Sequence, residues 1–251
     1  MTIVSLLLGW LGGWVVNYLA DVLPTTRSFS QPVCQRCQNA YRFMDYLLLQ
    51  KCVYCGAPRP VRAWAVQIMM PILSLLLWLF PGPLLPYPLG LVTVLYFSLV
   101  AITDLEYRVI LHPVSLFGAL LGLGTGLYLR SHESFGQGLS TTLIGGAVGF
   151  GIMFIFYLLG EAYVRRMAKK KNLPPDEVAL GFGDVNLGGI IGLFVGWPAI
   201  LAGLFFAILA GGAASLLIIL SMLLTKQYRA FLAIPYAPFL IFGALYLLFL
   251  A

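Results

Sequence analysis

The sequence predicts an all-α polytopic membrane protein with about eight transmembrane helices. Of its 251 residues, 61% are hydrophobic and only 10% carry a charge, whereas an ordinary soluble domain has about 25% charged residues. The apolar runs are long and show no strand-like alternation. Because helices satisfy their own backbone hydrogen bonds in hydrocarbon, these observations favour a helical membrane bundle.

Eight apolar segments approach the roughly 20 residues that a membrane span needs. The second is short, and the sixth and seventh meet at Gly196-Trp197-Pro198, where proline ends one helix and begins the next. Seven or nine spans are the alternatives. No basic stretch precedes the first segment, so we expect a retained helix rather than a cleaved signal peptide. The expected spans are 2–22, 64–80, 84–103, 110–129, 138–160, 180–197, 198–224 and 231–251.

Basic residues lie almost entirely in alternate loops. With eight spans, the segments 23–63, 104–109, 161–179 and 225–230 share one side and hold 14 of the 15 basic residues, and only Arg130 falls on the other. Lys and Arg concentrate in cytoplasmic loops, so we expect these four segments to face the cytoplasm and both termini to lie outside. The net charge of +6 therefore flanks the membrane, and we expect no nucleic-acid partner.

Four cysteines form two CxxC pairs, Cys34 with Cys37 and Cys52 with Cys55, separated by 14 residues. Each pair can turn two thiolates toward one centre, and two pairs complete a tetrahedral zinc site. Four thiolates leave no position for water, so we expect a structural zinc. A disulfide or a redox CxxC is the alternative, and a reducing compartment and the lack of a βαβ setting disfavour them.

The cysteine spacing also predicts the domain organisation. We expect residues 1–63 to form a first transmembrane helix with a small cytoplasmic zinc-binding loop, and residues 64–251 to form a helical core in the membrane. The loop has about 40 residues and is too small to build a core without a staple such as a metal ion.

Two acidic residues lie where a charge is costly. Asp104 ends the apolar run LVTVLYFSLVAIT, and Asp184 follows Gly-Phe-Gly at the start of the sixth span. Ionisable groups at membrane depth are expensive and usually functional. Both lie on the predicted cytoplasmic side, and Gly181 and Gly183 would let an extended peptide approach Asp184. A helix N-cap is the structural alternative for Asp184.

Paired carboxylates suit peptide hydrolysis. Two like charges close together share one proton, so one acid can take a proton from the attacking water while the other supports the developing oxyanion. The titration belongs to the pair, so the two roles are not assigned. His112 and His132 belong to no HExxH motif, and no GxSxG motif occurs. We expect the other acids to be surface or helix-end charges: Asp21, Asp45, Glu106, Glu133, Glu161, Asp176 and Glu177.

Together these motifs resemble the type IV prepilin peptidases, which are bacterial membrane aspartic peptidases with a GxGD signature. Gly181-Phe-Gly-Asp184 is similar to that signature, and Asp104 to the first catalytic acid of the family. Cys55-Gly-Ala-Pro58 and Ile234-Pro-Tyr-Ala-Pro238 resemble two further family segments. The resemblance covers nearly the whole chain and implies that Asp104 and Asp184 are catalytic and that the four cysteines bind zinc.

The resemblance further implies that the protein removes leader peptides from prepilins or pseudopilins at the cytoplasmic face of the bacterial inner membrane. Many members then methylate the new N-terminus with S-adenosylmethionine. Three positions depart from the family pattern: Val22 replaces an Arg, Gln67 a Glu and Asn186 a Lys. The first two lie in the half of the chain associated with methylation, so we expect peptidase activity and leave methylation open.

Two other classes of function remain as alternatives. A proton- or cation-coupled transporter would use Asp104 and Asp184 as a relay across the bilayer, but the predicted outer halves of the helices contain almost no ionisable group. A non-enzymatic platform for pilus assembly would use the cysteine loop to bind its partners.

Overall fold

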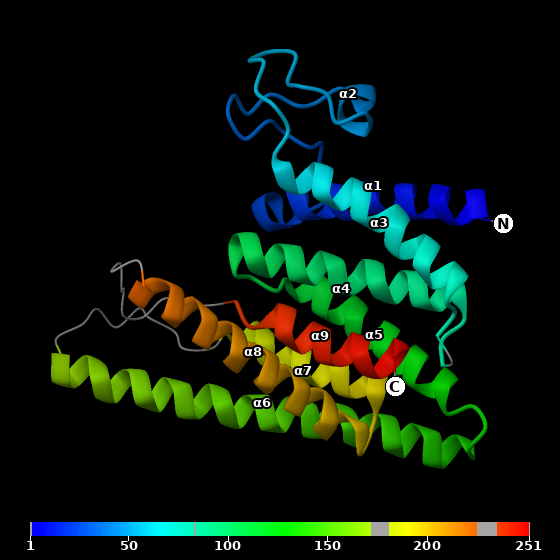
Figure 1. The fold of residues 1–251 in the computed structure, drawn as a ribbon, viewed down its shortest axis with the longest axis vertical. Helices are drawn as coiled ribbons and strands as arrows, with labels where there is room; N and C mark the ends of the chain where they lie inside the picture. Colours follow the sequence, from blue (N-terminus) through cyan, green and yellow to red (C-terminus); the bar gives the residue numbers. More distant parts are fainter. Residues whose placement is uncertain (1, 83, 172–180, 225–234, 251) are drawn as a thin grey trace. The chain divides into compact units, whose positions relative to one another are not determined.

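The computed structural model describes residues 2–82, 84–171, 181–224 and 235–250. Within these ranges every regular element is a helix (Figure 1), and an isolated bridge joins Val33 to Ala40. The predicted all-α fold class is confirmed. The helices are α1 (Thr2–Thr26), α2 (Phe43–Leu47), α3 (Val61–Leu79), α4 (Tyr87–Tyr107), α5 (His112–Leu129), α6 (Phe135–Lys171), α7 (Phe182–Val195), α8 (Ala199–Leu224) and α9 (Ala237–Phe249).

Six of the described helices are long and apolar enough to cross a membrane, namely α1, α3, α4, α5, α6 and α8. Helices α7 and α9 are apolar but have only 14 and 13 residues, which is about 20 Å at 1.5 Å per residue. A hydrocarbon core is about 30 Å thick. Each predicted span therefore contains a helix, but eight crossing helices remain a prediction. The predicted starts at 180 and 231 lie outside the described residues.

Several helices extend further than the apolar runs predicted. Helix α1 continues through Pro24, and α4 continues to Tyr107, so Asp104 lies inside its last turn. Helix α6 continues to Lys171 although a loop was predicted from residue 161. Glu161 and Arg165 form an ion pair of 2.5 Å on its surface. Charged residues such as Glu, Lys and Arg are good helix formers, so a helix can outlast its membrane-spanning part.

The chain divides into two compact units, Met1–Thr103 and Asp104–Ala251. The organisation predicted from the sequence, with a boundary after residue 63, remains a prediction. In the first unit α1 packs against α3. A Cβ at Gly9 would lie 2.6 Å from the Cα of Pro71, so glycine permits this approach. The Ser74 hydroxyl donates to the Ser5 carbonyl at 2.6 Å, and the Asn17 amide donates to the Ala63 carbonyl at 3.0 Å. These bonds fix the register of the two helices.

Two of the departures from the family pattern have a structural role in this packing. The Gln67 amide donates to the Trp10 carbonyl at 2.8 Å, and its oxygen accepts from Asn17 at 3.4 Å. An ionised glutamate could not make the first of these bonds, because it has no donor. Val22 is only 2% exposed and belongs to the core. Gln67 therefore serves the contact between α1 and α3, and Val22 is part of the buried core.

In the second unit α6 and α7 run side by side at very short distance (Figure 1). A Cβ at Gly192 would lie 2.1 Å from the Gly145 carbonyl oxygen, and one at Gly149 would lie 2.3 Å from the Gly188 oxygen. Small residues in membrane helices allow such approaches because the two backbones can touch.

The far end of α7 is also held in place. The Arg130 guanidinium donates to the Gly126 carbonyl at 2.9 Å and to the Val195 carbonyl, which lie at the C-terminal ends of α5 and α7. A cation is favourable there because carbonyls at a helix end lack intrahelical donors. The chain then turns at Gly196, whose φ is 72°, and α8 begins at Ala199. The predicted break at Gly196-Trp197-Pro198 is confirmed.

We predict that Gly192→Ala destabilises the second unit. The new Cβ would collide with backbone atoms of Gly145, and overpacking of this kind costs about 1–3 kcal/mol. Thermal unfolding in detergent measures the effect. Gly151→Ala on α6 is the control, since nothing lies within 4 Å of the new methyl group. Equal melting temperatures for the two variants would contradict the close packing described here.

Candidate functional site

The structure brings the two predicted catalytic acids together within the second unit. Asp104 lies in the last turn of α4 and Asp184 in the first turn of α7. The two residues are only 6% and 8% exposed. Their carboxylates are close enough to interact electrostatically. Two acids far apart in the sequence are therefore both buried and within electrostatic range of each other.

The start of α9 completes this arrangement. The Ala237 N–H donates to Asp104 Oδ2 at 3.3 Å. The first N–H groups of a helix have no intrahelical acceptor, so a carboxylate satisfies one of them and benefits from the positive end of the helix dipole. Tyr236 precedes Ala237 as the N-cap residue of α9. Three helices, α4, α7 and α9, thus converge on the pair.

Asp184 is not the N-cap of α7, which was the structural alternative for this residue. Gly181 occupies the N-cap with φ −73° and ψ 145°, and Asp184 is the third residue of the helix. Its Oδ1 is buried and has no hydrogen-bond partner in the described part of the chain. An unsatisfied buried polar atom is costly and is typical of a functional site.

The glycines on either side of Phe182 have different surroundings. A Cβ at Gly181 would lie 3.7 Å from Asp184 Oδ2, which is an ordinary contact. A Cβ at Gly183 would lie 3.0 Å from the Cβ of Ile110, so Gly183 lets the segment before α5 pack closely on α7. Sequence analysis did not identify this packing role. The predicted role of both glycines in admitting substrate remains a prediction.

Aromatic side chains hold the start of α7 against α6. The Phe182 ring centroid lies 5.9 Å from that of Tyr157 and 6.3 Å from that of Phe150, both in edge-on geometry. Such edge-to-face pairs contribute about 0.5–1.5 kcal/mol beyond area burial. With Ile110 and these rings on two sides, the backbone that carries Asp184 is firmly placed.

The four cysteines of the first unit form a second site, built from two knuckles of the same design. The Gln38 N–H donates to the Cys34 carbonyl, and the Gly56 N–H donates to the Cys52 carbonyl, each at 2.8 Å. Both donor residues have positive φ, 59° for Gln38 and 68° for Gly56. Each knuckle is therefore a tight turn that brings the second cysteine back beside the first.

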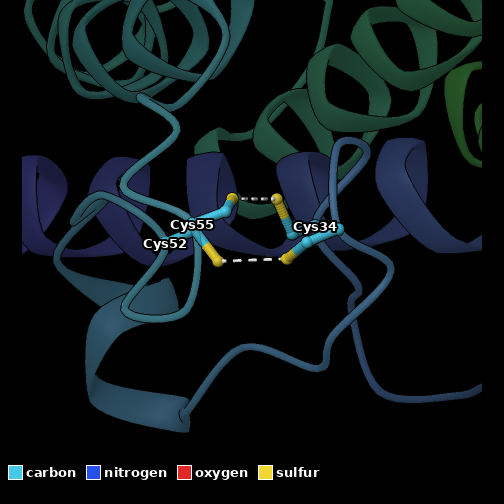
Figure 2. Close-up of side chains that lie close together, drawn as sticks. Cys34, Cys52 and Cys55 are labelled. Carbon is cyan, nitrogen blue, oxygen red and sulfur yellow. Dashed lines mark hydrogen bonds between the residues drawn. The ribbon is translucent and has the colours of Figure 1, made fainter.

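The thiols of the two knuckles face one another (Figure 2). The Sγ atoms of Cys34 and Cys55 are 3.7 Å apart, and those of Cys37 and Cys52 are 3.6 Å apart. All four Sγ atoms lie within 4.8 Å of one another, and all four cysteines are free of disulfides. The predicted ligand set is thus assembled as a group that can hold a metal ion.

Asp21 joins the cysteine loop to α1, a role that the sequence did not reveal. Its carboxylate accepts from the Tyr46 hydroxyl at 2.6 Å and from Arg59 at 3.1 Å, and it also pairs with Arg62. The Arg59 guanidinium lies over the rings of Tyr41 and Tyr46, 4.6 and 4.4 Å from their centroids. Burial, aided by Asp21, raises the pKa of Tyr46 and keeps it a donor. Asp21 is therefore an internal ion-pair partner and not a solvated helix-end charge.

Two cavities accompany these sites. A pocket of about 400 Å³ lies between the end of α1 and the cysteine loop and is lined by polar residues that include Arg36, Gln38 and Tyr41. An apolar groove of about 490 Å³ runs along α5, α6 and α7, with His112 and Asn186 among its few polar residues. Neither cavity was predicted from the sequence.

Comparison with known proteins identifies the family of the chain. Residues 91–216, half of the chain, match the family model of the type IV leader peptidase family. The chain belongs to this family. The matched segment includes Asp104 and Asp184 and begins after the cysteine loop. The prepilin leader peptidase/N-methyltransferase of Myxococcus xanthus (strain DK1622) is 25% identical over 223 residues, which is 85% of this chain. The chain spans 62% of the length of that relative. No solved structure matches the chain.

Proposed function

We propose that the protein is a membrane aspartic endopeptidase that removes the leader peptide of type IV prepilins or pseudopilins. The observation that carries this proposal is the buried pair of carboxylates from α4 and α7. Membership of the type IV leader peptidase family supports the reaction class. The name of the Myxococcus xanthus relative, a prepilin leader peptidase/N-methyltransferase, supports the substrate class.

The pair can perform the reaction with one shared proton. The ionised acid takes a proton from water as the water oxygen bonds to the scissile carbonyl carbon, and the protonated acid donates to the carbonyl oxygen. The C–N bond then breaks as the amine nitrogen receives a proton from the pair. The Ala237 N–H and the positive ends of α7 and α9 stabilise the single negative charge that remains.

We place this reaction at the cytoplasmic face of the bacterial inner membrane. The turn that begins at Asp104 and the cysteine loop are two of the four segments that together hold 14 of the 15 basic residues. Such an excess marks the cytoplasmic side. Gly181 is exposed beside Asp184 and offers an approach for an extended substrate. Lys226 and Arg229, which lie in another of these four segments, are outside the described residues.

We propose that the metal held by Cys34, Cys37, Cys52 and Cys55 is zinc. A tetrahedral zinc with Zn–S bonds of about 2.3 Å has sulfur atoms about 3.8 Å apart. The Sγ atoms of Cys34 and Cys55 are 3.7 Å apart, and those of Cys37 and Cys52 are 3.6 Å apart. Zinc would close the two knuckles and brace the loop. The four sulfurs complete its coordination, so the hydrolytic chemistry rests on the carboxylates.

N-methylation of the new N-terminus is a second candidate activity. It is supported by the name of the Myxococcus xanthus relative and by the polar pocket beside Cys34, whose 400 Å³ is in the size range of small-molecule sites. S-adenosylmethionine would supply the methyl group. Arg36 could bind its carboxylate, and Tyr41 and Gln38 offer ring and amide contacts. Val22 and Gln67, the departures from the family pattern, do not line this pocket.

We predict that Asp104→Asn or Asp184→Asn removes cleavage of a purified prepilin in detergent or liposomes. Loss of a general acid or base costs about 10²–10⁴-fold in rate. Mass spectrometry of the product detects cleavage and methylation as separate mass changes. Glu133→Gln, which neutralises an exposed acid, is the matched control and should cleave normally.

Three outcomes would overturn the proposal. Full cleavage by Asp184→Asn would exclude a catalytic pair. Ion flux into proteoliposomes that depends on both acids, without any cleavage, would indicate a relay. Complementation of a deletion strain by the double Asn variant would indicate an assembly platform.

We also predict that the purified chain carries about one zinc ion, as four thiolate ligands require. Cys52→Ser should lose the metal and leave the loop open to protease, because Cys52 is buried in the cluster. Gln35→Ala changes an exposed neighbour of Cys34 and serves as the control. Elemental analysis measures the metal, and an unchanged zinc content in Cys52→Ser would reject the assignment.

A further inference from the structure

An open groove in the second unit takes no part in the proposed chemistry. Helices α5 and α6 both pack against α7, and between them they leave a groove of about 490 Å³. Leu116 of α5 and Leu143 of α6 line it and are 64% and 48% exposed. Exposed leucines on membrane helices are as apolar as the lipid tails around them, so the groove opens toward lipid.

The floor of the groove is the side of α7 that is turned away from Asp184. An α-helix turns by about 100° per residue, which places Gly189, Ile190 and Leu193 on the side opposite to Asp184. These three residues line the groove. A ligand in the groove would therefore support the helix that carries Asp184 without entering the space between the two acids.

The groove is polar at one end only. His112, Ser115 and Asn186 line this end, near the starts of α5 and α7. All three side chains can donate hydrogen bonds, and the described residues that line the groove include no acid. The Ser115 hydroxyl oxygen is buried and has no hydrogen-bond partner in the described part of the chain. The first N–H groups of α5 add partial positive charge, so this end is complementary to an anionic acceptor.

The length of the groove indicates the kind of molecule that fits it. From the polar end it reaches Ala119 on α5 and Leu193 on α7, a distance of about 10 Å at 1.5 Å per residue. One leaflet contributes about 15 Å to a hydrocarbon core of about 30 Å. A partner helix that crosses the membrane would need a face along the whole core. An acyl chain that starts from a phosphate at the membrane surface needs only one leaflet.

We propose that the groove is a binding site for a phospholipid of the leaflet in which α5 and α7 begin. The lipid phosphate lies at the start of α5 and accepts hydrogen bonds from Ser115 and His112. One acyl chain runs between α5 and α6, where the small side chains of Ala119 and Ala147 leave room for it. This inference does not depend on the proposed peptidase function.

Photolabelling of the full-length protein in detergent tests the site. The probe is a phosphatidylglycerol with a diazirine in one acyl chain, titrated into delipidated protein, and labelled peptides are identified by mass spectrometry. We expect saturable labelling of the groove that unlabelled phosphatidylglycerol prevents. Ser115→Ala should raise the concentration for half-maximal labelling about tenfold, the effect of one hydrogen bond to a charged group. Equal labelling by a diacylglycerol with the same diazirine chain would reject the phosphate contact.

A matched pair of variants separates a specific site from the lipid that surrounds every membrane protein. Ala147→Phe places a ring in the groove and should abolish saturable labelling. Ala202→Phe makes the same change at an exposed position of α8 outside the groove and should label like the wild type. Labelling that does not saturate, or that Ala147→Phe leaves unchanged, would overturn the inference. A dimer that Ala147→Phe converts to a monomer, without saturable labelling, would show that a second copy of the chain fills the groove instead.

Discussion

Two buried carboxylates within electrostatic range of each other repel, and the rest of the second unit depends on how the repulsion between Asp104 and Asp184 is balanced. Such a pair keeps one proton and one negative charge, which needs donors and positive dipoles around it. The start of α9 supplies an N–H to Asp104, and the first turn of α7 surrounds Asp184 with its own positive end. The N–H groups at the starts of α7 and α9, which have no acceptor within their own helices, thus help to stabilise negative charge. This links the fold directly to the proposed chemistry.

The proposed chemistry requires α7 to hold Asp184 in a fixed position, and the packing of this short helix meets that requirement. Backbone contact with α6 along a glycine face, Arg130 at its C-terminal end and the Phe182 ring at its start restrain it along its whole length. The first unit applies the same principle to the cysteine loop. There Asp21 draws Arg59 and Tyr46 toward α1, and the two knuckles present four thiols to one centre. Both sites rest on fixed backbone rather than on single side chains.

Local signals in the sequence were sufficient for much of this account. Apolar runs located the helices, and the CxxC spacing located four cysteines that can hold a metal ion. The cost of a charge at membrane depth singled out Asp104 and Asp184, whose catalytic role remains a proposal. Contacts between segments that are distant in the sequence could not be predicted from such local signals. Nothing local indicates that Ala237 lies beside Asp104, or that Gly183 packs on Ile110. The prediction for Asp21 was wrong because its partners Arg59 and Arg62 are far from it in the sequence, on the other side of the cysteine loop. The predicted end of α6 was too early because residues 161–171 are polar but still favour a helix.

The most direct test of the shared pair is a distance. A variant carrying Asp104→Cys and Asp184→Cys is treated with a short thiol-reactive linker, and linked peptides are identified by mass spectrometry apart from those of the native cysteines. A variant with Asp104→Cys and Leu193→Cys is the control, because residue 193 lies about 13 Å further along α7. We expect efficient linkage of positions 104 and 184 and little in the control. Absence of the 104–184 link, although both thiols react with a monofunctional reagent, would contradict a common site.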